Sequence, residues 1–181
     1  MRADIPSWAL RLAGTDDVPA LNVIVQRAIE ELQTPYLSPE QIRASQEIMG
    51  LDTQLIEDGT YFVAELSGNI IGCGGWSRRA THFGGDHSPG RDARLLDPET
   101  EPARIRAMYT DPGYARQGIG RAIVAHCEQA AAREAFRSIE LVATTAGAPL
   151  YRACGYNEVE RFDERTPSGI GVPLIRMRKQ L

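Results

Sequence analysis

The sequence has few of the features that mark membrane, secreted or metal-binding proteins. It contains no apolar run near the roughly 18 residues that cross a bilayer, and residues 1–8 lack the basic stretch and apolar core of a signal peptide. Its cysteines are three, an odd number, with no C-x-x-C pair, so neither a disulfide framework nor a thiolate metal site is expected. These absences predict a cytoplasmic protein that does not enter membranes and holds reduced, buried cysteines.

Positive charge is also scarce. Twenty Lys and Arg residues against 24 Asp and Glu leave a net charge of −4, whereas binding along a nucleic-acid backbone favours a broad basic surface. No nucleic-acid partner is therefore expected, and any phosphate group must be bound locally. The 181 residues are 43% hydrophobic, enough to bury a sizeable core, and they predict a single domain over residues 1–181.

Periodicity and turn residues predict an α/β fold. A helix is expected from an N-cap at Thr15 to about Gln33, and a shorter one to about Met49 after Ser38, which forms a capping box with Gln41. The other predicted elements are strands at 8–12, 61–66, 69–76, 103–110, 138–143, 157–162 and 173–178, and helices at 118–133 and 148–154. This order gives one mixed sheet with helices on its faces. Residues 77–102 are expected to form a long loop, of a kind that is often functional.

The most informative stretch runs from Met108 to Arg121. A strand ends, Asp111-Pro112-Gly113 reverses the chain, and Gly118-Ile119-Gly120 opens a helix. Because glycine lacks a Cβ, an oxyanion can approach successive backbone N–H groups, and the helix N-terminus adds about half a positive charge. Arg116 and Arg121 add full charges beside it. The stretch therefore predicts a local site for a pyrophosphate.

Other glycine-rich loops fit this stretch less well. The Walker pattern requires Lys directly after Gly118, where Ile119 stands. The dinucleotide fingerprint requires a third glycine, where Ile123 stands, and the acid that it expects about twenty residues later, Glu140, lies inside a predicted strand. A tight strand-to-helix turn without any ligand is the alternative that a bare G-x-G motif leaves open.

The same stretch resembles the cofactor motif of the GCN5-related N-acetyltransferase (GNAT) family, Arg/Gln-x-x-Gly-x-Gly/Ala after a strand ending in Val-x-Pro. Thr110-Asp111-Pro112 stands at the Val-x-Pro position, and Gly118-Ile119-Gly120 supplies the glycines. The Arg/Gln position is Ala115, with Arg116 one residue later. The segment Leu150-Tyr151-Arg152-Ala153-Cys154-Gly155-Tyr156 is similar to the family's aromatic-Tyr-x-x-x-Gly-Phe element, although Thr144 replaces an Asn often found upstream.

The resemblance implies a mixed, mostly antiparallel twisted sheet flanked by helices, and transfer of an acetyl group from acetyl-CoA to a primary amine of a small molecule or protein by direct attack. It implies that coenzyme A contacts Met108, Tyr109, Thr110, Arg116, Gln117, Gly118, Ile119, Gly120 and Arg121. The backbone of Met108 and Thr110 would pair with the pantetheine arm, and the amide near Met108 would polarise the thioester carbonyl. Tyr151 would hydrogen-bond to the leaving thiolate, since a phenol of pKa about 10 gives up its proton to a thiolate of pKa about 8.5 only uphill.

The sequence does not identify a general base. Where several family members have a Glu, the strand has Arg104, with Arg106 on the same face; the pair suggests either an acceptor with a carboxylate or simple surface arginines. A water chain or an acid from elsewhere must serve. Four residues in or beside the long loop are either bases or solvated loop residues: His82, Asp86, His87 and Glu101. The first three could also be metal ligands, but scattered loop residues are a weak signal for a metal. No metal cofactor is expected. A non-catalytic acyl-CoA sensor and a nucleotide-binding or redox domain are the alternative functions, and a homodimer is left open.

Overall fold

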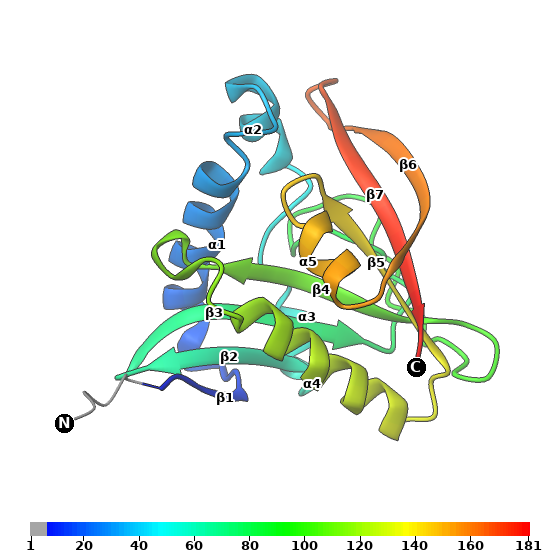
Figure 1. The fold of residues 1–181 in the computed structure, drawn as a ribbon. Helices are drawn as coiled ribbons and strands as arrows, with labels where there is room; N and C mark the ends of the chain where they lie inside the picture. Colours follow the sequence, from blue (N-terminus) through cyan, green and yellow to red (C-terminus); the bar gives the residue numbers. More distant parts are fainter. Residues whose placement is uncertain (1–6) are drawn as a thin grey trace.

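A computed structural model describes residues 7–181, so the expectation for residues 1–8 falls largely outside it (Figure 1). Within this range seven strands form one sheet in the order β1-β2-β3-β4-β5-β7-β6. The strands are β1 (Ala9–Leu12), β2 (Tyr61–Leu66), β3 (Asn69–Ser77), β4 (Ala103–Thr110), β5 (Ser138–Thr144), β6 (Asn157–Arg165) and β7 (Gly171–Gln180). Neighbouring strands are antiparallel except β4 and β5, which are parallel. The predicted fold class is confirmed.

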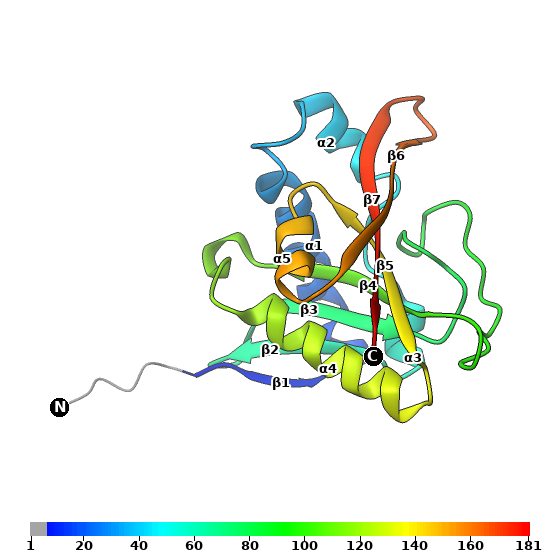
Figure 2. The ribbon, with the colours of Figure 1, turned by 45° about the vertical axis from the view of Figure 1, so that its right-hand side comes forward.

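Helices cover both faces of this sheet (Figures 1 and 2). The helices are α1 (Val18–Leu32), α2 (Pro39–Ser45), α3 (Thr53–Glu57), α4 (Ile119–Arg133) and α5 (Ala148–Ala153), with short 3-10 turns η1 (Thr15–Asp17) and η2 (Pro112–Tyr114). α4 and α5 pack on one face through a core that includes Ile123 and Cys127. α1, α2 and α3 pack on the other face, with Leu21 and Leu55 among their buried side chains.

The parallel pair, β4 and β5, is joined over only two residue pairs, Ala103↔Ile139 and Arg104↔Glu140. Beyond them the two strands diverge, and Figures 1 and 2 show the gap that opens between them. The edge of β4 that faces β5 therefore has no strand partner along its last residues. The main-chain groups there are free to bind something other than a neighbouring strand.

A bulge in β4 accompanies this divergence. Gly75 of β3 faces Arg106 and Cys73 faces Tyr109, so two residues of β4 oppose the single Gly74. Ala107, inside the bulge, has φ 51°, and its carbonyl accepts a hydrogen bond of 2.7 Å from the hydroxyl of the buried Tyr61. A bulge bends a strand and increases its twist. Here it turns the end of β4 away from β5.

The glycines of β3 make room for groups on the α4 face of the sheet. A Cβ on Gly72 would lie 2.6 Å from Cγ2 of Ile119, and a Cβ on Gly74 would overlap the sulfur of Met108. Glycine normally weakens a strand interior. At these two positions it is needed because α4 and the end of β4 approach the strand too closely for a side chain.

Several element boundaries differ from the sequence-based predictions. The helix predicted from Thr15 instead starts with η1, whose N-cap is Gly14; the Asp17 carboxylate accepts the Gly14 N–H at 2.8 Å. α2 ends at Ser45, and looser i to i+3 bonds continue the turn as far as Ile48. α3 was not predicted, because five residues are too few to show helical periodicity. β6 and β7 are longer than expected, since a partner strand supports residues whose own pattern is polar.

The long loop, residues 78–102, is fixed by a buried carboxylate. Asp52, the N-cap of α3, accepts from Nη2 of Arg106 at 2.9 Å and from Nη2 of Arg91 at 2.8 Å. Arg106, on β4, also donates to the carbonyls of Thr81 and Gly84, at 3.3 and 2.7 Å. Asp52 therefore ties the loop, α3 and β4 together at one point.

Replacing Asp52 with Asn should destabilise the fold by about 3–5 kcal/mol, because two guanidinium groups then share no buried negative charge. Urea unfolding of the wild type and Asp52→Asn measures the difference. Glu99→Gln, a change on the exposed surface of the same loop, is the control and should leave the unfolding free energy unchanged. Equal loss in the two variants would show that Asp52 has no special role.

Candidate functional site

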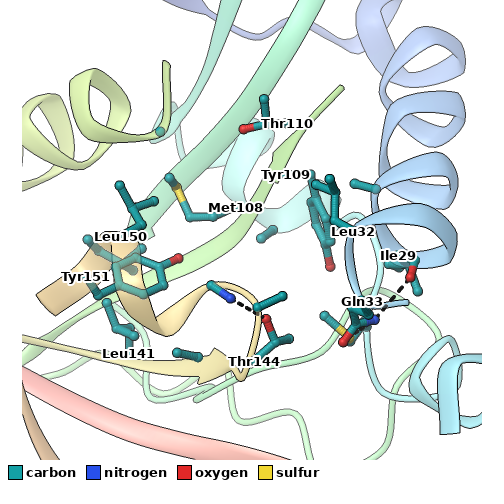
Figure 3. Close-up of a pocket in the computed structure, with 18 of the residues that line it drawn as sticks. Ile29, Leu32, Gln33, Met108, Tyr109, Thr110, Leu141, Thr144, Leu150 and Tyr151 are labelled. Carbon is teal, nitrogen blue, oxygen red and sulfur yellow. Dashed lines mark hydrogen bonds between the residues drawn. The ribbon is translucent and has the colours of Figure 1, made fainter. Parts of the chain in front are cut away.

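A cavity of about 650 Å³ occupies the gap between β4 and β5. Figure 3 shows it bounded by the end of β4, the start of α5 and the inner side of α1. One end reaches η2 and the first turn of α4, and the other end reaches α1 and the 78–102 loop. The cavity thus follows the unpaired edge of β4.

The α4 end of the cavity has the geometry of an anion site. Gly118, the N-cap of α4, has φ 83°, and a Cβ placed there would have no neighbour within 4 Å. Arg116, two residues earlier, also has a left-handed backbone, with φ 66°. The first N–H groups of an α-helix have no partner inside the helix, and the residues that begin α4, Gly118, Ile119 and Gly120, line this cavity. The exposed side chains of Arg116 and Arg121 flank it.

Gly120 has a different role from Gly118. A Cβ on Gly120 would lie 2.8 Å from Cδ2 of Leu150, so its absence lets α5 pack against the first turn of α4. Of the two glycines of the motif, one supplies a left-handed turn and the other supplies close packing. Both line the cavity.

The end of β4 presents alternate side chains to the two faces of the sheet. Met108 packs against the α4 core, whereas Tyr109 points toward α1, as Figure 3 shows. The Tyr109 hydroxyl accepts from the Gly50 N–H at 3.0 Å and lies 3.3 Å from the Gly50 carbonyl. Burial raises the pKa of Tyr109, so the phenol stays neutral. Its side chain is a tether for β4, and only its backbone is left for a ligand.

Tyr151 of α5 lies across the cavity from β4 (Figure 3). Its ring is buried and meets Tyr156 edge-on, with centroids 5.9 Å apart. The hydroxyl points into the cavity and has no hydrogen-bond partner among the described residues around it. Burial raises the pKa of Tyr151, so at neutral pH this group does not ionise and can donate a hydrogen bond to a ligand.

The turn into α5 depends on Thr144. Its hydroxyl accepts the Gly147 N–H at 3.0 Å, and its carbonyl accepts the same N–H at 3.2 Å. Thr144 stands where the family often has Asn, and the hydroxyl fixes the turn that positions Tyr151.

The cavity wall brings together nine of the ten residues predicted for the site: Met108, Tyr109, Thr110, Arg116, Gly118, Ile119, Gly120, Arg121 and Tyr151. The tenth, Gln117, is exposed and does not line the cavity.

Of the four loop residues considered as bases, His82 alone lines this cavity. The Asp86 carboxylate accepts the N–H of Thr53 at 3.0 Å, and His87 Nε2 lies 2.7 Å from the Gln46 carbonyl. Glu101 pairs with Arg94 at 2.8 Å on the surface. These three side chains stabilise the loop and its surroundings.

The interpretation of Arg104 and Arg106 as surface arginines was wrong, because both side chains are buried. Arg106 is buried against Asp52, and Nη1 of the buried Arg104 donates to the Pro102 carbonyl at 2.9 Å. The same Nη1 lies 3.7 Å from Oε1 of Glu140. Both arginines lie beside internal carboxylates, and Arg106 also lines the cavity.

Sequence reasoning missed two groups of residues. Glu140 was discounted because it lies in a strand, although a carboxylate in an otherwise apolar strand is itself a signal of a buried polar cluster. The α1 end of the wall includes Gln33, Tyr36 and Met49. No local pattern marks these residues, because they join the site only through tertiary packing. Within residues 7–181, no cluster of three or more His, Cys, Asp and Glu side chains is placed to hold a metal, and no helix is long and apolar enough to cross a membrane.

A mostly antiparallel sheet that splits between its two parallel strands, with a glycine-led helix starting at the split, defines an α/β protein with an elongated cavity at that split. A family model described as the Acetyltransferase (GNAT) family matches residues 25–156. The chain belongs to this family and is an acyl-CoA-dependent N-acetyltransferase. The resemblance seen in its glycine and Tyr151 segments is thereby confirmed.

Solved structures share the fold. A GCN5-related N-acetyltransferase from Rhodopseudomonas palustris has a TM-score of 0.72 at 20% identity, over 99% of each chain. The ribosomal-protein-alanine N-acetyltransferase of Brucella melitensis has a TM-score of 0.64 at 20% identity, over 96% of this chain and 99% of that chain. The PaiA N-acetyltransferase of Thermoplasma acidophilum, solved in complex with coenzyme A, has a TM-score of 0.63 at 12% identity, over 97% of this chain and 99% of that chain. A search of curated proteins finds no significant match.

Replacing Gly118 with Ala should lower the free energy of unfolding by about 1 kcal/mol, because the left-handed backbone at φ 83° disfavours a Cβ although the space around it is open. Urea unfolding provides the measurement. Gly14→Ala is the matched control: Gly14 also caps a helical turn, but its φ of −113° suits any residue. Equal unfolding free energies of Gly118→Ala and Gly14→Ala would show that the left-handed backbone at residue 118 does not require glycine.

Proposed function

We propose that this protein transfers the acetyl group of acetyl-CoA to a primary amine of a small molecule or of a protein, by direct attack of the amine on the thioester. The observation that carries the proposal is the cavity at the split between β4 and β5, which runs from the N-terminus of α4 to the hydroxyl of Tyr151. The coenzyme A complex of the Thermoplasma relative supports the choice of ligand. On this proposal residues 1–181 act as one cytoplasmic domain that binds neither nucleic acid nor membrane.

The residues at the α4 end fit a pyrophosphate. The backbone N–H groups of Gly118, Ile119 and Gly120 would bind its oxygens, and the helix dipole favours negative charge there. Arg116 and Arg121 would add charge at the rim, and Gln117 would contact the outer side. The open space at Gly118 is the feature that a bound phosphate needs, because a side chain there would occupy it.

The unpaired edge of β4 fits the pantetheine arm. The backbone of Met108, Tyr109 and Thr110 would pair with its amides like an added strand, since no β5 residue pairs with this edge. An N–H near Met108 would polarise the thioester carbonyl, an interaction that contributes a few kcal/mol when it strengthens in the transition state. Bound acetyl-CoA supplies the activated acetyl carbon.

Tyr151 would hold the departing sulfur. Its hydroxyl faces the cavity without a partner, and its raised pKa makes full proton transfer to a thiolate unfavourable. A hydrogen bond to a charged sulfur is the contribution that we assign to it. Such bonds are worth about 1.5–3 kcal/mol.

Tyr151→Phe should therefore lower kcat for acetyl transfer by roughly 10- to 100-fold, the equivalent of about 1.5–3 kcal/mol, and leave the affinity for coenzyme A nearly unchanged. Free thiol released from acetyl-CoA with a panel of amines gives the rate, and calorimetry gives the affinity. Tyr156→Phe is the control, because that ring packs against Tyr151 but does not line the cavity.

Two results would overturn the proposal. Coenzyme A binding without amine-dependent thiol release would identify a non-catalytic sensor. Greater thermal stabilisation by NAD or ATP than by coenzyme A would identify a nucleotide-binding domain; a ligand at 100 times its Kd stabilises by about 2.7 kcal/mol, so the comparison is easily resolved.

A further inference from the structure

The cavity wall contains one group that can accept a proton near neutral pH. Among the described residues that line it there is no Asp, Glu, Lys or Cys, and arginine and tyrosine are side-chain types that do not accept a proton near neutral pH. The exception is His82, on the 78–102 loop, with 46% of its side chain exposed. A base that acts inside this cavity without an intervening water chain must be His82.

A buried carboxylate stands behind His82. Oε1 of Glu140 lies 3.5 Å from Nδ1 of His82, and only 1% of Glu140 is exposed. The other oxygen, Oε2, accepts from Nε and Nη2 of Arg178 at 2.9 and 2.6 Å. Arg178 thus occupies Oε2, whereas Oε1 lies near both the imidazole of His82 and, at 3.7 Å, Nη1 of Arg104. A carboxylate in this position favours the tautomer with the proton on Nδ1, which leaves Nε2 free to accept.

Burial and the neighbouring arginines keep the imidazole of His82 neutral. Burial is the main cause that lowers the pKa of His82 below its ordinary value of about 6.5, and Arg104, Arg106 and Arg176 lower it further, whereas Glu140 raises it. At pH 7 the imidazole is therefore deprotonated and able to act as a base. Protonation of His82 is still tolerated because Glu140 offsets part of the added charge.

We propose that His82 is the general base of the acetyl transfer and that Glu140 is the residue that positions it; this rests on the function proposed above. The amine nitrogen forms a bond to the acetyl carbon, and the bond from that carbon to sulfur breaks, so that sulfur leaves with the electron pair. His82 accepts the proton that the nitrogen loses as the amide forms, and releases it to solvent. The thiolate, held by Tyr151, takes a proton from solvent.

The test measures kcat/KM for the amine with wild type, His82→Ala and the control His87→Ala, a histidine of the same loop outside the cavity. In His82→Ala, kcat/KM for the amine should fall about 10²- to 10⁴-fold, the usual contribution of a positioned base. In His87→Ala, kcat/KM should equal that of the wild type. Added imidazole should restore part of the loss, because the site is open to solvent. Coenzyme A affinity and thermal melting should match the wild type.

The ratio of wild-type to His82→Ala rates should depend on pH between about pH 5 and 8. The protonation of the amine affects both enzymes equally and cancels in this ratio. The rate ratio is therefore constant while His82 is neutral, and it falls as the pH drops through the pKa of His82. In Glu140→Gln the fall should move to lower pH, because the carboxylate that raises the pKa of His82 is lost. A carboxylate with only a structural role would reduce activity without moving the fall.

A His82→Ala variant with wild-type activity, or a rate ratio that does not change with pH, would overturn the assignment of the base. These outcomes differ from failure of the proposed function, in which the wild type itself acetylates no amine. If Glu140→Gln does not fold, the rates, imidazole rescue and pH profile of His82→Ala still decide the proposal.

A second and independent observation concerns the acceptor. The α1 end of the cavity is walled mainly by apolar side chains: Ile29, Leu32, Ile48, Met49, Phe83 and Leu174. Besides Tyr36, this end has the buried amide of Gln33, whose Nε2 donates to the Ile29 carbonyl and to Oγ of Ser45 at 3.2 and 3.1 Å. Its Oε1 has no partner among the described residues. This end of the cavity therefore combines a mainly apolar wall with the Oε1 acceptor of Gln33, unpaired within residues 7–181.

Charge at this end excludes additional cations. Arg106 and Arg91 share the single carboxylate of Asp52, which leaves a net positive charge beside the wall. No Asp or Glu is among the described lining residues. A second ammonium group on the acceptor would lose its hydration here without gaining an anionic partner, and that burial is costly.

We infer that the acceptor is a primary amine carried on an uncharged, apolar group, and not a polyamine; this also rests on the proposed function. With acetyl-CoA, kcat/KM for 2-phenylethylamine should exceed that for spermidine by about tenfold or more, the equivalent of ~1.4 kcal/mol. Leu32→Glu should reduce the preference by placing a carboxylate on the wall. Val23→Glu, on the same helix but 59% exposed, should leave it unchanged.

A wild type that prefers spermidine, or that acetylates a peptide N-terminus faster than every small amine in the panel, would overturn this inference. A Leu32→Glu variant with an unaltered preference would do so as well, provided that its melting temperature matches that of Val23→Glu. If no amine is acetylated by the wild type, it is the proposed function that fails.

Discussion

The early separation of β4 from β5 is the constraint on which the site depends. Two parallel strands that stay paired present no free main-chain groups, and they leave no space for a ligand between them. Here pairing stops at Arg104 and Glu140, and the bulge at Ala107 turns the rest of β4 away. The cavity, the unpaired edge and the approach of α4 and α5 all follow from that divergence. The hydroxyl of the buried Tyr61 stabilises the bulge by donating a hydrogen bond to the Ala107 carbonyl.

Two buried carboxylates on one face of the sheet organise the acceptor side. Asp52 lies between Arg106 and Arg91, and fixes the 78–102 loop to β4. Glu140 pairs with Arg178 and faces His82 from the same loop. Burying an ion pair seldom adds much net stability, but removing one partner is costly. Such pairs therefore specify position well, and here they specify where the loop places its histidine.

The predicted fold and the glycine-led end of the site depended on patterns that are local in the chain. The hairpin of β2 and β3, the capping box at Ser38 and the glycine-led start of α4 are each encoded by a few adjacent residues, and the structure confirms those elements. The errors have physical causes. α3 is too short for periodicity, and Arg104 and Arg106 looked like surface residues because their carboxylate partners, Glu140 and Asp52, are more than thirty residues away in the chain.

The sequence by itself determined the family, the order of the strands and of every helix except α3, and the turn at Gly118 where α4 begins, because backbone preferences and hydrophobic periodicity act between near neighbours. Only the tertiary structure decided which side chains meet. It placed His82 in the cavity wall and left Asp86, His87 and Glu101 outside it. It also brought His82 next to Glu140 of β5, and α1 to the far end of the cavity. Contacts between distant segments depend on how the whole sheet twists and splits, and no local stretch of the chain encodes that.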